Sequence, residues 1–305
     1  MFYVCKTKKI LIVGGTGFIG YHLAKESLKK KWEVTSISSH KVKNKRSLTK
    51  VSYIYCDISK KNSLKKIQNK KYDYVVNLGG YVDHGDKKKT MASHFIGCKN
   101  LSNFFLNKNI SSFIQMGSSV EYGKTKSPQK EKARLSVKNL KSTYGKAKLL
   151  ATNHLIELNR KKKFPVTILR LYLTYGPKQD LNRLIPITIN SCLNNKRFPC
   201  SHGIQFRDFV YIDDVVRAIF NAIKYKKAQG QVINIGSGKP IQIRNIIKMI
   251  LNISKGGKPQ FGMINLRKDE ILKLYPDSSK ALALLKWKPK ISLKFGIKKT
   301  INSFK

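Results

Sequence analysis

Acidic residues are scarce in this chain of 305 residues, in which 16 Asp and Glu stand against 62 Lys and Arg and the net charge is +46 at pH 7. Because the charge is so high, nucleic acid and anionic membrane surfaces must be considered as binding partners. Arginine is also scarce: only ten of the basic residues are Arg, whereas readers of phosphates and bases favour the guanidinium fork. The lysines are spread over the whole chain. We therefore attribute the charge to compositional bias and expect no specific nucleic-acid binding.

Long apolar runs are absent, since no stretch of 18 apolar residues occurs and the first apolar run is too short for a signal peptide. We therefore expect no membrane insertion and a cytoplasmic protein. Paired cysteines are absent as well, because no C-x-x-C motif joins any of the five, which are Cys5, Cys56, Cys98, Cys192 and Cys200. Their odd number and irregular spacing favour free thiols and no bound metal. The hydrophobic content of 41% still predicts a folded chain with a large core.

Glycines gather where the first apolar run ends, in residues 8–20 (KKILIVGGTGFIG). The apolar run predicts a buried parallel strand, and the helical spacing of the apolar residues that follow predicts a helix. Gly14 would permit the tight turn, Gly17 a close approach to a ligand, and Gly20 close packing of helix on strand. Amide groups at the start of that helix would face a pyrophosphate. A dinucleotide site is favoured over a plain turn, although the spacing is G-x-x-G-x-x-G.

Strand and helix patterns alternate up to Tyr175-Gly176-Pro177. Strands are predicted at 10–13, 33–37, 51–55, 74–78, 112–116 and 165–170, with helices after the first strand and over 60–70, 88–107 and 140–160. This alternation predicts an α/β fold with a doubly wound parallel sheet. Later elements are shorter and more often interrupted by glycine. We expect residues 1–175 to form a dinucleotide-binding domain and residues 176–305 mainly a smaller α/β substrate lobe, whose strands can return to the sheet.

Tyr144 and Lys148 lie four residues apart on the last of these helices, so they share one helix face. An ammonium close to a phenol favours the phenolate, which makes Tyr144 a candidate proton donor or acceptor. Ser118 and Ser119 follow the strand at 112–116, where a hydroxyl can reach the same ligand. A Y-x-x-x-K pair alone could be accidental in so lysine-rich a chain. The order of glycine turn, serine and Y-x-x-x-K is a more specific signal.

With these motifs the chain resembles the extended short-chain dehydrogenase/reductase family, in particular its nucleotide-sugar epimerase/dehydratase branch. The resemblance covers nearly the whole chain. It rests on residues 14–20, 56–58, 117–123 (GSSVEYG), 144–148, 169–177 (LRLYLTYGP), 205–214 (QFRDFVYIDD), 234–238 (NIGSG) and 285–289 (LKWKP). The resemblance implies a Rossmann sheet and NAD(P)-dependent chemistry on a nucleotide-linked sugar.

The resemblance also implies roles for single residues. Tyr144 would be the acid/base, Lys148 would hold the nicotinamide ribose, and Ser118 would hydrogen-bond the reacting sugar oxygen. Asp57 and Ile58 would flank the adenine. The remaining expected cofactor contacts are Gly14, Thr16, Gly17, Phe18, Ile19, Gly20, Ser38, Leu78 and Gly79, and Ser119 is a further expected substrate contact.

Arg207 would bind a phosphate of the nucleotide sugar by the same resemblance. The residue type supports this independently, because a guanidinium fork suits a diphosphate better than a lysine does. The alternative, in which Arg207 pairs with Asp208 or Asp213 at the surface, stays open.

Departures from the family pattern bear on the reaction. Ser119 and Val120 stand where nucleotide-sugar 4,6-dehydratases carry two acidic residues. Glu121 comes one residue late and, on an extended backbone, would point the other way. Dehydration is therefore disfavoured. Leu173 replaces an Asn that often contacts the substrate phosphate. Gly79-Gly80 replaces a small Ala pair and is followed by the segment 81–84 (YVDH). Its Asp83 and His84 could contact sugar hydroxyls or lie in a surface loop.

The predicted end of the second strand bears on the cofactor. Ser38 stands where NAD-dependent members usually carry an Asp for the adenosine ribose. The next residues include Ser39, His40, Lys41 and Lys43. Without a carboxylate a 2′-phosphate would be accepted, so NADP(H) is favoured, with NAD(H) as the other cofactor.

The leading hypothesis is therefore reduction of a 4-keto-6-deoxy sugar at C4, with a 4-ketoreductase-like role for the protein. The alternatives are a nucleotide-sugar 4-epimerase with tightly bound NAD, and a non-catalytic nucleotide-binding protein, since a fold alone proves no activity. A homodimer is an expected assembly, although the sequence leaves the oligomeric state open.

We predict that the high charge gives no specific binding to DNA or RNA. At near-physiological salt the Debye length is about 8 Å, so dispersed lysines are largely screened. Filter binding or fluorescence anisotropy should then give dissociation constants no tighter than roughly 10⁻⁴–10⁻⁶ M, the non-specific range. Nanomolar, sequence-dependent binding under those conditions would overturn the attribution of the charge to composition.

Overall fold

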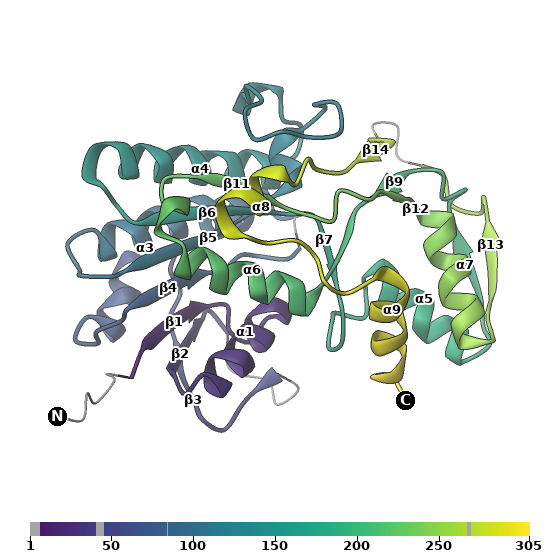
Figure 1. The fold of residues 1–305 in the computed structure, drawn as a ribbon, viewed down its shortest axis with the longest axis horizontal. Coiled ribbons are helices and arrows are strands. Elements are labelled where there is room, and N and C mark those ends of the chain that lie inside the picture. Colours follow the sequence, from purple (N-terminus) through teal and green to yellow (C-terminus); the bar gives the residue numbers. More distant parts are fainter. Residues whose placement is uncertain (1–6, 41–45, 84, 267–269) are drawn as a thin grey trace.

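Seven parallel strands form the central sheet of the computed structural model, which describes residues 7–40, 46–83, 85–266 and 270–305 (Figure 1). The strand order is β11-β6-β5-β4-β1-β2-β3, and every neighbouring pair is parallel. The strands are β1 (Lys9–Val13), β2 (Glu33–Ser38), β3 (Val51–Tyr55), β4 (Tyr74–Asn77), β5 (Ser112–Ser118), β6 (Val166–Leu171) and β11 (Val232–Ile235). The predicted doubly wound α/β sheet is confirmed.

Both faces of this sheet are buried, as its continuous apolar runs require. Along β1, Ile10 and Ile12 belong to the core on one face, whereas Leu11 and Val13 belong to the core on the other. All six residues of β6 are buried. The period of two in side-chain direction therefore feeds two separate cores from one strand.

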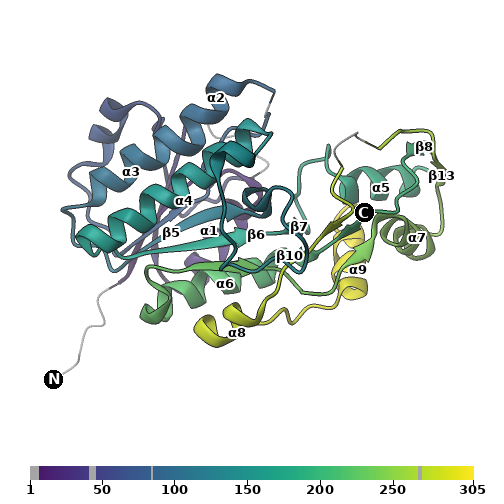
Figure 2. The ribbon, with the colours of Figure 1, turned by 90° about the horizontal axis from the view of Figure 1, so that it is seen from above.

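Helices cover the two faces in two layers (Figure 2). On one face lie α1 (Phe18–Lys29) and α6 (Ile212–Lys224), which contact each other. On the other face lie α2 (Lys87–Met91), α3 (Gly97–Phe105) and α4 (Thr143–Lys162). Since β1 pairs with both β2 and β4, the chain reverses its direction of winding there. Ligands of such sheets bind outside the carboxyl ends of the strands at this switch point.

The segment expected to be an amphipathic helix over 60–70 is instead a 3-10 helix, Lys61–Ile67. Its buried residues are Leu64 and Ile67, three apart, which matches the three-residue turn of that helix. Another difference lies within the helix expected over 88–107. There, α2 and α3 are joined by one π-helical turn, Ala92–Ile96.

Two predicted boundaries also shift. The helix expected from residue 140 begins at Thr143, because Leu140 has an extended backbone and Ser142 caps the helix by accepting from the Gly145 amide. Strand β5 runs two residues beyond Met116, so Ser118 is its last residue and not part of the loop.

A smaller lobe lies beside the carboxyl edge of the sheet and holds small sheets of two or three short strands together with helices (Figure 2). Its strands are β7 (Leu173–Tyr175), β8 (Arg197–Cys200), β9 (Phe206–Arg207), β10 (Phe209–Tyr211), β12 (Ile241–Gln242), β13 (Lys258–Phe261) and β14 (Lys273–Leu274). Its helices are α5 (Leu184–Leu193), α7 (Ile243–Ser254) and α9 (Leu293–Asn302). Helix α8 (Ser279–Leu285) contacts β11. Since β11 and α6 come after residue 175 yet belong to the sheet layers, the domain boundary at that residue stays a prediction.

The C-terminal segment is fastened to the sheet layer through Asp214, at the start of α6. Its buried carboxylate accepts from the amides of Lys290 and Ile291, 3.0 Å away, and pairs with Arg217. The indole of Trp287 donates to the Asp214 carbonyl oxygen at 2.8 Å. The LKWKP motif is thus a packing element of the fold.

The thiols of Cys56, Cys98, Cys192 and Cys200 are free, as expected, and all four are buried, while Cys5 lies outside the described residues. Burial raises the pKa of each of the four thiols, that of Cys98 to about 12. Such thiols are poor nucleophiles near neutral pH. Within the described ranges, no helix combines the length and the apolar character needed to cross a membrane.

Candidate active site

The glycine turn joins β1 to α1 at the switch point of the sheet. Gly14 has φ of +79°, a conformation that favours glycine, and its amide donates to the Ile37 carbonyl at 2.8 Å. A Cβ on Gly20 would collide with the Gly14 carbonyl and lie 2.6 Å from the Gly15 Cα, so only glycine lets helix and strand approach this closely. Helix α1 begins after Gly17 with no side-chain cap. No capping side chain therefore competes with an anionic ligand for its first amides, and Thr16, Phe18 and Ile19 belong to the same turn.

The neighbouring strand ends supply the remaining residues expected around a dinucleotide. Ser38 ends β2, and its hydroxyl donates to the His40 carbonyl at 2.5 Å. Asp57 follows β3 and accepts from the amide and hydroxyl of Ser59, at 3.0 and 2.7 Å. Beside it, Ile58 is buried. Lys41 and Lys43, which entered the NADP(H) argument, lie outside the described residues.

The end of β4 completes this edge. Leu78 donates its amide to the Val13 carbonyl at 3.1 Å, and the Gly79 amide donates to Asn77 Oδ1 at 3.1 Å. The first bond holds the segment against the end of β1, and the second is local to the segment. The residues of the cradle therefore fit a dinucleotide, with glycine where a side chain would close the space and uncapped amides where a pyrophosphate would lie.

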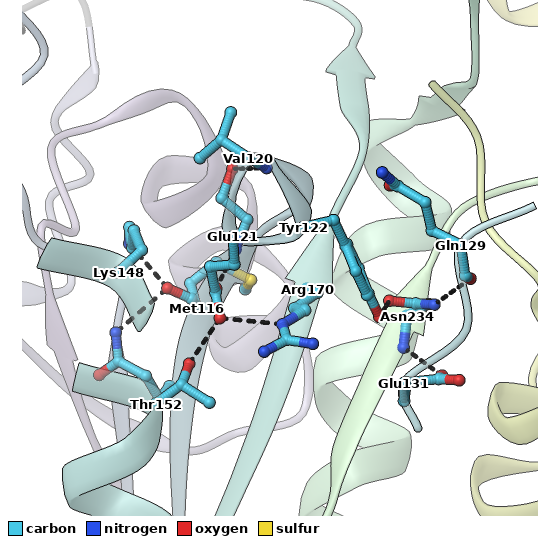
Figure 3. Close-up of polar contacts among 12 residues, drawn as sticks. Met116, Val120, Glu121, Tyr122, Gln129, Glu131, Lys148, Thr152, Arg170 and Asn234 are labelled. Carbon is cyan, nitrogen blue, oxygen red and sulfur yellow. Dashed lines mark hydrogen bonds and ion pairs between the residues drawn. The ribbon is translucent and has the colours of Figure 1, made fainter. Parts of the chain in front are cut away.

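Lys148 and Tyr144 occupy one face of α4, beside the end of β5. The Lys148 ammonium is buried and donates to the Met116 carbonyl at 2.7 Å (Figure 3). It lies 5.8 Å from the centre of the Tyr144 ring. Ser118, at the end of β5, is half-buried. The three residues expected to do chemistry thus come from two adjoining elements, β5 and α4, which pack on each other.

His94 was not singled out by the sequence, yet its ring packs edge-on against the Tyr144 ring at 4.8 Å between centres. It lies in the π-helical turn, is buried, and its Nε2 is 3.1 Å from the Tyr81 carbonyl. Such turns are frequent at functional sites. The sequence signal was the pair Gly79-Gly80, because a Cβ on Gly80 would overlap the His94 ring.

The expectation that Glu121 lies on an extended backbone is wrong, because the residue belongs to a 3-10 turn, Ser119–Tyr122. Its side chain is fully buried and its Oε2 accepts from Arg170 Nε at 2.9 Å. Burial disfavours the charged guanidinium, but the interactions with Glu121 and Tyr122 together outweigh this and raise the pKa of Arg170. Ser119, expected as a substrate contact, is buried in the same turn. The turn therefore leaves no exposed carboxylate from Glu121 beside Ser118, and Ser119 is buried as well.

Arg207 is buried and pairs with Glu270, so the alternative that it pairs with Asp208 or Asp213 is wrong. Its Nη1 also donates to the carbonyls of Phe206 and Ile271, both at 2.7 Å. Asp208 instead accepts from Ser237 at 2.7 and 2.9 Å. Burial lowers the pKa of the Arg207 guanidinium. Glu270 is 63 residues away in the chain, and no local pattern predicted it.

Two further departures can be placed. Leu173 begins β7 and has 41% of its surface exposed. Asp83 accepts from the Gly85 amide at 3.1 Å, an arrangement typical of a surface turn, and His84 lies outside the described residues. The described part of the chain holds no cluster of His, Cys, Asp and Glu that could bind a metal ion.

Comparison with known proteins gives one family, described as the NAD dependent epimerase/dehydratase family, which matches residues 10–236. The chain is 27% identical to the putative UDP-glucose 4-epimerase of Methanocaldococcus jannaschii, over 97% of this chain and 98% of that protein. It is 25% identical to the UDP-glucose 4-epimerase of Thermotoga maritima, solved with UDP-glucose, over 97% of this chain and 98% of that one, with a TM-score of 0.90. The UDP-glucuronic acid 4-epimerase of Bacillus cereus, solved with UDP-glucuronic acid and NAD, is 26% identical over 97% and 98% of the two chains, with a TM-score of 0.86.

We predict that Gly80→Ala destabilises the protein by about 1–3 kcal/mol, because the added methyl group overpacks the His94 ring. The double variant Gly80→Ala/His94→Ala should regain part of this loss. Urea unfolding of the unmodified protein, the two single variants and the double variant should give a coupling energy of about 0.5–3 kcal/mol. Gly85→Ala is the control, because a Cβ there meets only the end of the Asp83 side chain, at 3.2 Å. Strictly additive effects would show that the two residues do not contact each other.

Proposed function

This chain belongs to the NAD-dependent epimerase/dehydratase family, and from that premise we propose that it carries out oxidoreduction at C4 of a nucleotide-linked sugar. The observation that carries the proposal is the arrangement of three side chains at the carboxyl end of β5. Ser118 ends β5, while Tyr144 and Lys148 share the adjoining face of α4. All three lie at the carboxyl edge of the sheet, where a dinucleotide and a sugar can meet.

Tyr144 is the proposed acid/base. Its phenol would give a proton to the sugar oxygen during reduction of C4 or take it during oxidation. The ammonium of Lys148 lies 5.8 Å from the centre of the Tyr144 ring, and its bond to the Met116 carbonyl fixes its position. Ser118 would hydrogen-bond the same sugar oxygen and orient it.

The cofactor would be held by the glycine turn and the strand ends. Amides at the start of α1 would bind the pyrophosphate, Asp57 and Ile58 would flank the adenine, and Lys148 would hold the nicotinamide ribose. When bound, the dinucleotide supplies hydride exchange with the sugar carbon. The chain's own contribution is orientation, proton transfer at Tyr144 and exclusion of water.

Dehydration is not proposed. Eliminating water needs an acid and a base besides Tyr144, and Ser119 and Val120 follow Ser118 instead of carboxylic acids. The carboxylate of Glu121, which accepts from the Ser118 amide, is fully buried and already bonded through both oxygens. It is therefore unsuited to exchange protons with a sugar.

Two reactions at C4 remain, net reduction and 4-epimerisation, and Ser38 favours net reduction. A hydroxyl at the end of β2 leaves room for a 2′-phosphate, which supports NADP(H) and net reduction of a 4-keto-6-deoxy sugar. The second candidate is 4-epimerisation with tightly bound NAD. It is favoured by the UDP-glucose and UDP-glucuronic acid 4-epimerases among the similar proteins, one of which was solved with NAD.

Arg207 is the proposed ligand of a substrate phosphate. The guanidinium is buried and oriented by two backbone carbonyls, so it loses little side-chain freedom on binding. A phosphate would have to replace or share the carboxylate of Glu270. The UDP-sugars bound by similar proteins support a nucleoside diphosphate as the anion. The homodimer expected from the sequence stays a prediction.

We predict that Tyr144→Phe lowers turnover roughly 10²- to 10⁴-fold, the scale expected for one general acid. Cofactor affinity should hardly change, because the lost group moves a proton and does not bind the dinucleotide. Turnover would be measured on a panel of UDP-, dTDP-, CDP- and GDP-linked sugars, and affinity by dinucleotide fluorescence. Tyr225→Phe is the control, since Tyr225 follows the far end of α6. Wild-type turnover of Tyr144→Phe on any accepted sugar would refute the catalytic assignment.

We also predict that NADPH binds at least as tightly as NADH and that Ser38→Asp reverses the order, because a carboxylate repels the 2′-phosphate and binds a free ribose. Fluorescence titration of both cofactors checks this. Ser39→Asp places the same charge on the exposed neighbouring residue and should change the ratio less. A clear preference of the unmodified protein for NADH would favour the epimerase.

A further inference from the structure

The carboxylate of Glu121 joins three elements, β5, α4 and β6, and Figure 3 shows its contacts with Thr152 and Arg170. Its Oε1 accepts from the Ser118 amide at 2.8 Å. Its Oε2 accepts from Thr152 Oγ1 at 2.8 Å and from Arg170 Nε at 2.9 Å. Both oxygens are thus used, and the residue is fully buried.

Burying this charge is unfavourable unless it is paired and hydrogen-bonded, so its position demands an explanation. Arg170 supplies the opposite charge, with 4% of its side chain exposed. Space for the carboxylate depends on Gly117, because a Cβ there would lie 2.7 Å from Glu121 Oε1. The sequence therefore keeps a glycine next to Ser118 where the carboxylate reaches the backbone.

Thr152 connects the same carboxylate to the face of α4 that bears the proposed acid/base. Tyr144, Lys148 and Thr152 follow one another at intervals of four residues, so they lie along one helix face. Two connections thus link this face to the end of β5. One runs from Lys148 to the Met116 carbonyl, and the other runs from Thr152 through Glu121 to the Ser118 amide.

We propose that Glu121 is a positioning residue, which sets the register between Ser118 and Tyr144. It holds the Ser118 backbone by accepting its amide, and the Ser118 hydroxyl faces the Val120 amide in the reciprocal half of the same cap. The carboxylate does not touch the substrate. The inference rests on the proposed function, in which the Ser118 hydroxyl and the Tyr144 phenol meet at one sugar oxygen.

The first test is Glu121→Gln. A neutral amide has one oxygen, so it cannot accept from both the Ser118 amide and Arg170 as the carboxylate does. Small misplacements of reacting groups are costly, and we expect kcat to fall roughly 10- to 100-fold while KM and cofactor affinity change less than about threefold. Amide hydrogen exchange should rise in the peptide that contains Ser118. This second measurement does not depend on turnover.

Paired variants separate positioning from stability. In Glu121→Gln the buried guanidinium of Arg170 loses its carboxylate partner. The double variants Glu121→Gln/Arg170→Met and Glu121→Met/Arg170→Met both remove this unpaired charge, so both should regain thermal stability relative to Glu121→Gln. Only the former keeps an oxygen that can accept from the Ser118 amide. We expect kcat and the protection of the Ser118 amide from hydrogen exchange to recover only in the double variant Glu121→Gln/Arg170→Met. Equal recovery of kcat in both would mean that Glu121 acts only through stability and would overturn the inference.

Two further variants complete the design. Asp214→Asn is the matched control, because that buried carboxylate also accepts backbone amides and pairs with an arginine but holds the C-terminal segment. It should lower the unfolding temperature and leave kcat unchanged. If Glu121 variants do not fold, Thr152→Val keeps the ion pair and removes only the bond to α4. It should lower kcat roughly three- to tenfold at unchanged stability, and wild-type kcat would refute the proposal.

Tyr144→Phe, assayed in parallel, separates the two possible failures. If it is inactive while Glu121→Gln keeps wild-type kcat and a protected Ser118 amide, the role of Glu121 is wrong and the proposed function stands. If Tyr144→Phe retains wild-type turnover, the proposed function is wrong and the role of Glu121 falls with it.

Discussion

Parallel strands need crossover helices, and these helices must cover both faces of the sheet. In this protein, alternate residues of β1 therefore enter two cores, with Ile10 and Ile12 in one and Leu11 and Val13 in the other. The carboxyl ends of all the strands consequently meet at one edge. Because β1 pairs with β2 on one side and β4 on the other, the helices diverge at this edge and leave room for a ligand.

The remaining features of the site depend on this edge. Near the glycine turn the site is formed mainly by backbone groups. Gly20 lets α1 pack closely on the turn, and the start of α1 has no capping side chain to compete with an anion for its amides. Buried charges predominate near β5, where Lys148 bonds to the Met116 carbonyl and Glu121 pairs with Arg170. A buried ion pair is weak evidence for stability, but it can fix a unique geometry. Here that geometry concerns Ser118, the residue proposed to orient the sugar oxygen.

Much of this arrangement could be predicted from local patterns. Apolar runs and glycine spacing gave β1 and the turn, and the four-residue interval placed Tyr144 and Lys148 on one helix face. Contacts between distant residues could not be predicted in this way. Glu270 pairs with Arg207 across 63 residues, and Glu121 meets Arg170 across 49. The turn that carries Glu121 was misjudged because its cap is built by Ser118, whose place at the end of β5 was not foreseen.

The central claim is that hydride exchange occurs at C4 of a nucleotide-linked sugar in the site formed by Ser118, Tyr144 and Lys148. The most direct measurement is a single turnover of the protein loaded with reduced dinucleotide that carries deuterium at the transferable position of the nicotinamide. It would be mixed with 4-keto-6-deoxy sugars linked to UDP, dTDP, CDP or GDP, and the products examined by deuterium NMR. Ketoreduction and the reductive half of epimerisation both predict deuterium at C4 of an accepted sugar. Deuterium at another carbon, or its complete retention in the dinucleotide with every sugar, would contradict the claim.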